Sequence, residues 1–278
     1  MASKEEIRIG HSPDSDDAFM FYALAKNIIP TGNFNFIHVI EDIESLNKRA
    51  INGELEVTAI SVHTYAYVAD KYALLPCGAS IGDRYGPIIV SAAPIKPEEL
   101  EGKTIAIPGT MTTAYLTCRL FLPNFAYKIV PFNQILDSVV QKQVDAGLII
   151  HEGQLTYSHV GLHKVVDLGE WWYDQTGLPL PLGANAIRKD LGINKMRQIS
   201  ELLKASIQYA LEHRAESLDY AMAYARGIKQ NLADRFVGMY VNNYTLDYGE
   251  KGRAGVRRLL EWGYQAGVIK NVVEVEFV

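Results

Sequence analysis

The sequence predicts an α/β protein of two lobes, in which each lobe is a mainly parallel β-sheet flanked by helices. Three observations predict this class. Short apolar segments alternate with helical patterns from residue 7 onward, as βαβ units do. A segment rich in proline and charge, residues 94–103, interrupts the alternation, which then resumes. A later apolar segment, residues 176–187, is interpreted as the path by which the chain returns to the first unit.

The first unit is expected to contain four strands with helices between them. Asp14 and Ser15 are both suited to begin its first helix. The second helix places Ile43, Leu46, Ala50 and Ile51 on one face. In chain order we expect a strand at 7–12, a helix at 16–27, a strand at 35–41, a helix at 43–52, a strand at 55–61, a helix at 62–73 and a strand at 86–92.

The second unit repeats the alternation, and the final third of the chain is mainly helical. We expect the late helices to pack on the first lobe, which then comprises residues 1–92 and 182–278, while residues 93–181 form the second. The expected strands are 104–109, 127–132 and 146–152, the helices between them 111–122 and 134–144, and the late helices 196–226, 232–244 and 254–268.

Composition excludes several classes of function. The chain has 278 residues and a net charge of −5, without a basic stripe, so nucleic acid is not an expected partner. Its two cysteines, Cys77 and Cys118, lie in apolar segments and predict buried thiols. The sequence lacks a glycine-rich nucleotide motif, a P-loop and a metal-ligand cluster, so we expect no cofactor and no metal. No apolar segment predicts a signal peptide or a membrane span, so we expect a cytoplasmic protein.

A ligand site is expected where strands end, because open parallel sheets bind ligands beyond the carboxyl ends of their strands. Four loops qualify, and two lobes that face each other would bring them to one cleft. They are residues 11–19, 60–65, 107–115 and 149–154.

The third of these loops has the character of an anion site. Gly109 follows Pro108 in a tight turn, and Thr112 and Thr113 stand where a helix begins. Backbone N–H groups and hydroxyls at a helix N-terminus favour an anion. The alternative is that one threonine only caps the helix. Ser61, at the end of a strand, raises the same two interpretations.

The first and fourth loops carry ionisable groups. Asp17 suits either ligand hydroxyls or the helix dipole, and His11 either lines the cleft or simply ends a strand. His151 ends a strand, where an imidazole can take and return a proton at neutral pH. The alternative is a structural histidine. His63, just inside a helix, is a lesser candidate.

Four motifs resemble a known enzyme family. Residues 11–24 (HSPDSDDAFMFYAL), 86–91 (GPIIVS), 107–116 (IPGTMTTAYL) and 147–157 (GLIIHEGQLTY) together resemble the 1,4-dihydroxy-6-naphthoate synthases of the futalosine pathway to menaquinone. The resemblance covers essentially the whole chain. The parts HSPDSDDAF and IIHEGQ are specific, whereas PGT before a helix is shared with many two-lobed binding proteins.

The resemblance implies a fold, a reaction and roles for residues. The fold is the type II periplasmic-binding-protein-like fold. The activity is that of a lyase, which cleaves cyclic dehypoxanthine futalosine to 1,4-dihydroxy-6-naphthoate and a sugar-derived fragment. His151 corresponds to the family's proposed catalytic base, and Ser61, Thr112 and Thr113 to its ligand-contacting hydroxyls.

Two other functions stay open at this point. A solute-binding protein can have the same fold, because fold does not determine function. Chorismate dehydratase, an enzyme of the same pathway, shares the fold as well, although the HEGQ motif favours the synthase. The expected partner is a small carboxylated substrate, and the sequence does not predict an oligomeric state.

Overall fold

The computed structural model describes residues 4–225 and 227–278 as two compact units. The first unit comprises residues 1–80, 183–250 and 273–278, and the second comprises 81–182 and 251–272. Arg226, the last residue of the predicted helix 196–226, lies outside the described residues.

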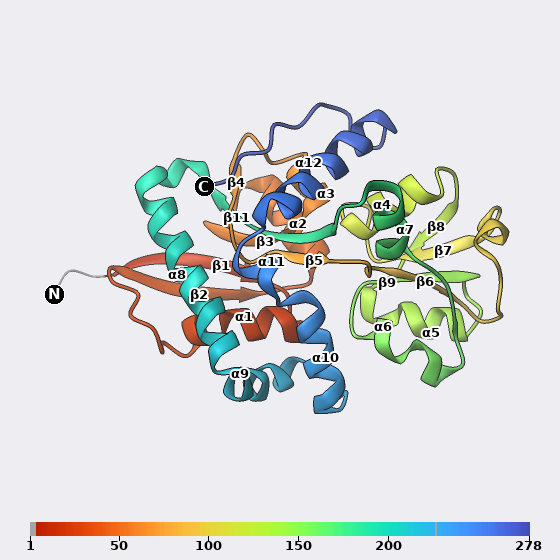
Figure 1. Cartoon of the computed structure of the whole chain (residues 1–278), viewed down its shortest axis with the longest axis horizontal. Helices are drawn as coiled ribbons and strands as arrows, with labels where there is room; N and C mark the ends of the chain where they lie inside the picture. The colour runs from red at the N-terminus through yellow and green to blue at the C-terminus, as the bar shows by residue number, and fades with distance from the viewer. Residues whose placement is uncertain (1–3, 226) are drawn as a thin grey trace. The chain divides into compact units, whose positions relative to one another are not determined.

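The first unit is built on a mixed sheet with the strand order β2-β1-β3-β11-β4 and with β5 paired to β11 (Figure 1). β1 runs parallel to β2 and β3, whereas β11 runs antiparallel to β3 and β4. The strands are β1 (Glu5–His11), β2 (Phe34–Ile40), β3 (Val57–Ser61), β4 (Tyr72–Leu74), β5 (Ser80–Gly82) and β11 (Leu180–Arg188).

Helices of the first unit pack in two groups against this sheet. The larger core places α1, α8, α9 and α10 against apolar residues of β1 and β3 such as Ile9 and Val57. A smaller cluster joins α2 to the sheet through Leu46, Leu55 and Ala59. The helices are α1 (Ser15–Ala25), α2 (Ile43–Asn52), α3 (Val62–Tyr65), α8 (Ile193–Glu212), α9 (Arg214–Ala221), α10 (Gln230–Tyr240) and α11 (Asn243–Leu246).

The second unit has its own mixed sheet, with the strand order β10-β6-β9-β7-β8. One apolar cluster packs α4 and α7 against it through residues such as Cys118, Ile105 and Leu168, and a second packs α5 through Ile135 and Val139. The strands are β6 (Ile88–Ser91), β7 (Thr104–Ile107), β8 (Ala126–Ile129), β9 (Ala146–Ile149) and β10 (His163–Asp167), and the helices α4 (Thr113–Phe121), α5 (Ile135–Val140), α6 (Gly153–Thr156), α7 (Leu168–Thr176) and α12 (Gly249–Gln265).

The two-lobed α/β class is confirmed, but each sheet is mixed, whereas the sequence predicted mainly parallel sheets. Antiparallel strands enter through β11 in the first unit and through β6 and β10 in the second. The predicted helix 62–73 is wrong beyond its first turn. Its end forms the start of β4, because Ala73 pairs with Ile187 and the Tyr72 hydroxyl donates to the carbonyl of Leu55 at 2.7 Å. Here strand pairing overrides local propensity.

The boundaries of the units differ from the expected lobes in two segments and at one further residue. Residues 81–92 and 251–272 and Leu182 belong to the second unit. The reason for the later segment is the packing of α12. Trp262 lies 5.6 Å from the rings of both Trp171 and Trp172, and a Cβ at Gly255 would lie 2.7 Å from the carbonyl oxygen of Pro179. Most of α12 therefore does not pack on the first lobe as predicted.

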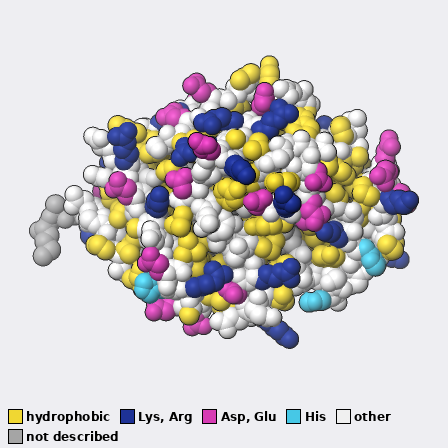
Figure 2. Space-filling view, in the orientation of Figure 1, with side chains coloured by type: hydrophobic (Ala, Val, Ile, Leu, Met, Phe, Trp, Pro, Cys, Tyr) yellow, Lys and Arg dark blue, Asp and Glu magenta, His cyan; other side chains and the backbone are white. Residues whose placement is uncertain are grey.

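The distribution of surface charges and the burial of the two cysteines agree with what the composition predicts. On the face seen in Figure 2, acidic and basic side chains are interspersed with apolar ones. Cys77 and Cys118 are buried and unpaired with each other, as predicted. Among the described residues, every helix is too short or too polar to cross a bilayer.

Candidate functional site

His151 lies just beyond the carboxyl end of β9, and both nitrogens of its ring are engaged. Nε2 lies 2.9 Å from the carbonyl oxygen of Phe132, and the backbone N–H of Gly153 donates to Nδ1 at 2.9 Å. A carbonyl oxygen only accepts, so Nε2 carries the proton and Nδ1 is the acceptor. The side chain is buried and meets the Phe132 ring edge-on, at 5.5 Å between centroids.

This hydrogen bonding restricts what the imidazole can do as a base. Nε2 already carries a proton, and the lone pair of Nδ1 accepts from Gly153. The ring can therefore take a proton only after Nδ1 has exchanged the Gly153 N–H for a proton donor on a ligand, or after the ring has turned. The described geometry is that of a resting imidazole whose orientation is fixed.

Gly153 has a steric as well as a hydrogen-bonding role beside His151. A Cβ at this position would lie 2.7 Å from Cε1 of His151 and 2.9 Å from Cδ1 of Leu136. Real Cβ atoms do not approach so closely, so the absence of a side chain leaves room for the ring. Glycine in the HEGQ motif was the signal for this contact in the sequence.

The loop before α4 uses its threonines internally. The hydroxyl of Thr112 accepts from the N–H of Tyr115 at 3.2 Å and donates to the carbonyl of Gly109 at 2.8 Å. Thr112 is thus the N-cap of α4, the alternative role that the sequence left open. The hydroxyl of Thr113 donates to the carbonyl of Leu182 at 2.6 Å. Both hydroxyl protons are therefore directed to backbone carbonyls.

We expect Thr112→Val to lower the free energy of unfolding by about 1 kcal/mol, because valine keeps the shape but leaves the N–H of Tyr115 without its cap. Thr112→Ser should keep the wild-type value, since serine retains the hydroxyl. Urea denaturation followed by circular dichroism measures both. A Thr112→Val midpoint equal to that of the wild type would show that α4 does not need this cap.

Ser61 ends β3 in the first unit and is held by a residue that the sequence did not single out. The Asn47 side chain donates to the Ser61 hydroxyl at 3.1 Å and accepts from the Ser61 N–H at 2.8 Å. Asn47 is fully buried on α2. The signal was available, because Asn47 is polar but stands four residues after Ile43, on the apolar face of this helix.

Asp17 is buried in the first turn of α1, and its carboxylate accepts from the backbone N–H of Ser12 at 2.6 Å. Burial raises the pKa of Asp17 to about 7, while the hydrogen bonds from Ser12 act in the opposite direction. The hydroxyl of Ser12 donates to Asp14 at 2.9 Å. Asp17 thus organises the loop after β1, in addition to the ligand contact that the sequence predicts for it.

His11 is also enclosed. Its side chain is 2% exposed and stacks on Phe21 at 4.7 Å between centroids. Its Nδ1 lies 3.2 Å from the carbonyl oxygen of Ser12, and its Nε2 lies 3.0 Å from Nδ1 of His38. Nε2 of His63, the lesser candidate, lies 3.3 Å from the hydroxyl of Tyr67, four residues later in the chain.

Each unit contains part of the predicted set. His151, Gly109, Thr112 and Thr113 belong to the second unit, and His11, Asp17 and Ser61 to the first. Within the described part of the chain, no three His, Cys, Asp or Glu residues are grouped as metal ligands would be.

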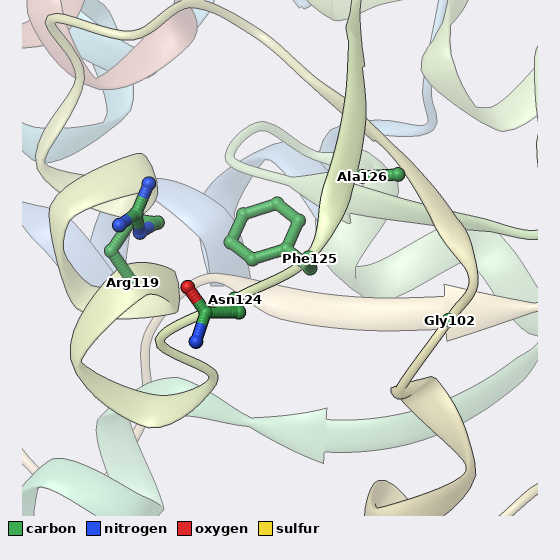
Figure 3. Close-up of a pocket in the computed structure, with 5 residues that line it drawn as sticks. All are labelled: Gly102, Arg119, Asn124, Phe125 and Ala126. Carbon is green, nitrogen blue, oxygen red and sulfur yellow. The ribbon is translucent and has the colours of Figure 1, made fainter.

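A surface depression of about 360 Å³ lies elsewhere on the second unit. Figure 3 shows that the side chains of Arg119, Asn124 and Phe125 line it together with Gly102 and Ala126. None of the described residues that line it is a predicted site residue. We therefore do not place the candidate site there.

Comparison with known proteins identifies relatives over nearly the whole chain. A family model described as menaquinone biosynthesis matches residues 7–265. A 1,4-dihydroxy-6-naphthoate synthase of Thermus thermophilus is 42% identical over 255 residues, which cover 92% of this chain and 93% of that protein. A protein of the same name from Streptomyces coelicolor is 38% identical over 273 residues, 96% of each chain.

Solved structures agree with the fold. A crystal structure of a protein from Archaeoglobus fulgidus has a TM-score of 0.92 at 47% identity and covers 95% of this chain and 98% of its own. A Candida albicans protein described as having the generic periplasmic-binding-protein fold has a TM-score of 0.72 at 12% identity, with coverage of 96% and 92%. The chain therefore belongs to the menaquinone biosynthesis family and has the periplasmic-binding-protein fold.

Proposed function

We propose that this chain is a lyase, which converts cyclic dehypoxanthine futalosine to 1,4-dihydroxy-6-naphthoate without a cofactor and with His151 as the general base. The names of its relatives support the activity. The observation that carries the assignment of the base is the imidazole of His151 beyond the end of β9, oriented by hydrogen bonds at both nitrogens. A cytoplasmic location, expected from the sequence, is part of the same proposal.

The chemistry needs proton transfer rather than electron transfer. Removal of one proton from the substrate would begin ring opening and the cleavage of a carbon–carbon bond. The naphthoate product is aromatic, and the gain of aromaticity favours the forward direction. A general base positioned beside the reacting atom contributes typically about 10²–10⁴-fold in rate.

The tautomer of His151 supports Nδ1 as the nitrogen that acts in this proposal. Nε2–H already faces the carbonyl of Phe132, so a proton taken up at Nδ1 would give an imidazolium that keeps this hydrogen bond. A carbonyl oxygen stabilises such a cation. In this proposal, the substrate's acidic group replaces the Gly153 N–H at Nδ1, and the Phe132 carbonyl then orients the ring throughout the step.

Substrate binding is assigned to the polar groups that the family resemblance names. We propose that the first turn of α4, with Thr112 and Thr113, binds the substrate carboxylate, and that Ser61, oriented by Asn47, binds a hydroxyl group. Because both threonine hydroxyls donate to carbonyls, backbone N–H groups are better placed than hydroxyls to hold an anion. Gly109, His11 and Asp17 then shape the loops around the ligand.

Mass spectrometry of the reaction products tests this function directly. We expect the purified chain to convert cyclic dehypoxanthine futalosine to 1,4-dihydroxy-6-naphthoate and to leave chorismate unchanged. Dehydration of chorismate instead would assign the chain to the other enzyme of the pathway. If it binds one of these compounds tightly and converts neither, the chain is a binding protein and our proposal is wrong.

A further inference from the structure

The buried His11 and the partly buried His38 form an imidazole pair in the first unit, between the neighbouring parallel strands β1 and β2. Nε2 of His11 lies 3.0 Å from Nδ1 of His38. The two rings meet nearly at right angles, at 78° and 5.2 Å between centroids, and Phe21 of α1 stacks on the other side of His11. The direction of the hydrogen bond between the imidazoles follows from the remaining contacts.

The contact with the carbonyl of Ser12 identifies the tautomer of both rings. The carbonyl oxygen lies 3.2 Å from Nδ1 of His11 and can only accept, so His11 carries its proton on Nδ1. A neutral His11 then has its lone pair on Nε2. His38 must donate from Nδ1 to that lone pair, which leaves Nε2 of His38 unprotonated. Nε2 of His38 is buried and has no hydrogen-bond partner among the described residues.

The surroundings keep both rings neutral. Burial lowers the pKa of each imidazole to about 4, and a charge on His38 would further oppose a charge on His11. Carboxylates lie close in the chain but face other groups. Asp17 accepts from the N–H of Ser12 and Asp14 from its hydroxyl, while Glu41 contacts His11 through backbone atoms.

We propose that His38 is a positioning residue: its Nδ1–H holds His11 in the Nδ1–H tautomer, and His11 thereby fixes the carbonyl of Ser12 and the segment Ser12–Asp17 for substrate binding. The proposal rests on the proposed function, which assigns this segment to the ligand site. In this proposal His11 acts through the backbone carbonyl that it contacts. It does not bind the ligand itself, because its ring is 2% exposed and both ring nitrogens are already engaged.

Two variants separate the hydrogen bond from the bulk of the side chain. His38→Asn places an amide N–H where Nδ1 stood and can still donate to His11. His38→Leu fills similar space but has no donor, so that Nε2 of His11 becomes a buried acceptor without a partner. Such a group is costly. His163→Leu is the matched control, because His163 is exposed on β10 in the other unit.

Nuclear magnetic resonance of ¹⁵N-histidine-labelled protein tests the tautomers. Long-range proton–nitrogen correlations should show Nδ1–H on both His11 and His38 in the wild type. In His38→Leu the His11 pattern should change, and in His38→Asn it should be retained. An Nε2–H tautomer of His11 in the wild type, or an unchanged His11 pattern in His38→Leu, would overturn the proposal.

Kinetics and amide exchange test the consequence for the segment. His38→Leu should raise KM about tenfold and leave kcat within about twofold, while His38→Asn restores KM, because the segment binds substrate without taking part in the chemistry. Amide hydrogen exchange at Ser12 should become faster in His38→Leu alone. If exchange at Ser12 is unchanged, or if both variants have the same KM, His38 does not position this segment.

Absence of turnover in the wild type would contradict the proposed function instead, and the exchange and tautomer measurements would still decide the role of His38.

Discussion

His151→Ala should lose about 10²–10⁴-fold in kcat while the protein stays folded, because the change removes the only group to which proton transfer is assigned. The alanine also leaves a space that the imidazole occupied beside Phe132. Added imidazole should therefore restore part of the activity, with a pH dependence that follows the free imidazole. Steady-state kinetics that follow the formation of 1,4-dihydroxy-6-naphthoate measure both effects.

His151→Gln is the sharper variant for the role of the ring. Its amide N–H can replace Nε2–H opposite the carbonyl of Phe132, so the local structure is kept without a basic nitrogen. We expect it to be as inactive as His151→Ala and as stable as the wild type. His163→Ala, in the same unit, should be fully active. A kcat within threefold of the wild type in His151→Gln would remove His151 from the mechanism.

Ligand binding offers an independent check on the nitrogen that acts. In the resting enzyme we infer the Nε2–H tautomer of His151, since the N–H of Gly153 donates to Nδ1. Proton uptake at Nδ1 needs this bond to be exchanged. The nuclear magnetic resonance signal of the Gly153 amide should therefore shift when product binds.

Local signals in the sequence were sufficient to predict an element whose two ends are capped by residues beside it in the chain. Helix α2 is the clearest case, since residues 43–52 were predicted with both ends correct. Asp42 caps its start by accepting from Glu44 and Ser45, and Gly53 ends it in a left-handed conformation. The apolar face and both caps lie within twelve residues, so no distant contact could change the outcome.

Distant pairing explains where the prediction failed. Residues 62–73 have a helical pattern, but β4 forms because β11, over a hundred residues later, supplies its hydrogen bonds. Strand β10 and helix α7 were not predicted, and the antiparallel pairing of β10 with β6 could not be read from either segment alone. The placement of α12 likewise depends on tryptophans far away in sequence.

The candidate site shows the same division. The type and position of His151, Thr112 and Ser61 were visible in the sequence, because each follows or ends a predicted strand. Their partners were not visible, since two are backbone groups, the carbonyl of Phe132 and the N–H of Gly153. A backbone group has no identity in the sequence that could mark it as the partner of a particular imidazole.

Gly169→Ala should destabilise the protein by about 3 kcal/mol or more, the largest stability effect that we expect of a single methyl group. Gly169 lies in the first turn of α7, where its N–H donates to Asp167 at 2.8 Å. A Cβ here would lie 2.0 Å from the carbonyl carbon of Tyr85 and 2.4 Å from the nitrogen of Gly86. These are backbone atoms, so no side-chain rotation can relieve the overlap.

The backbone has little freedom to move where the start of α7 contacts Tyr85 and Gly86. The neighbouring N–H of Leu168 donates to the carbonyl of Pro87 at 2.9 Å, which holds the start of α7 against the segment that leads into β6. Relief of the overlap would have to break this bond or shift β6 within its sheet. Both routes reach the core of the second unit, where Leu168 is fully buried.

Gly238→Ala is the matched control, because it adds the same methyl group to a helix interior without the overlap. Gly238 is exposed in α10, and the nearest atom to its added Cβ would be the flexible end of Arg214, at 3.4 Å. Alanine should stabilise this helix by roughly 0.5–1 kcal/mol. Urea midpoints should therefore shift in opposite directions for the two variants. Equal midpoints for Gly169→Ala and the wild type would show that α7 can withdraw from residues 85–87 at almost no cost, and the close backbone contact would then not hold this unit together.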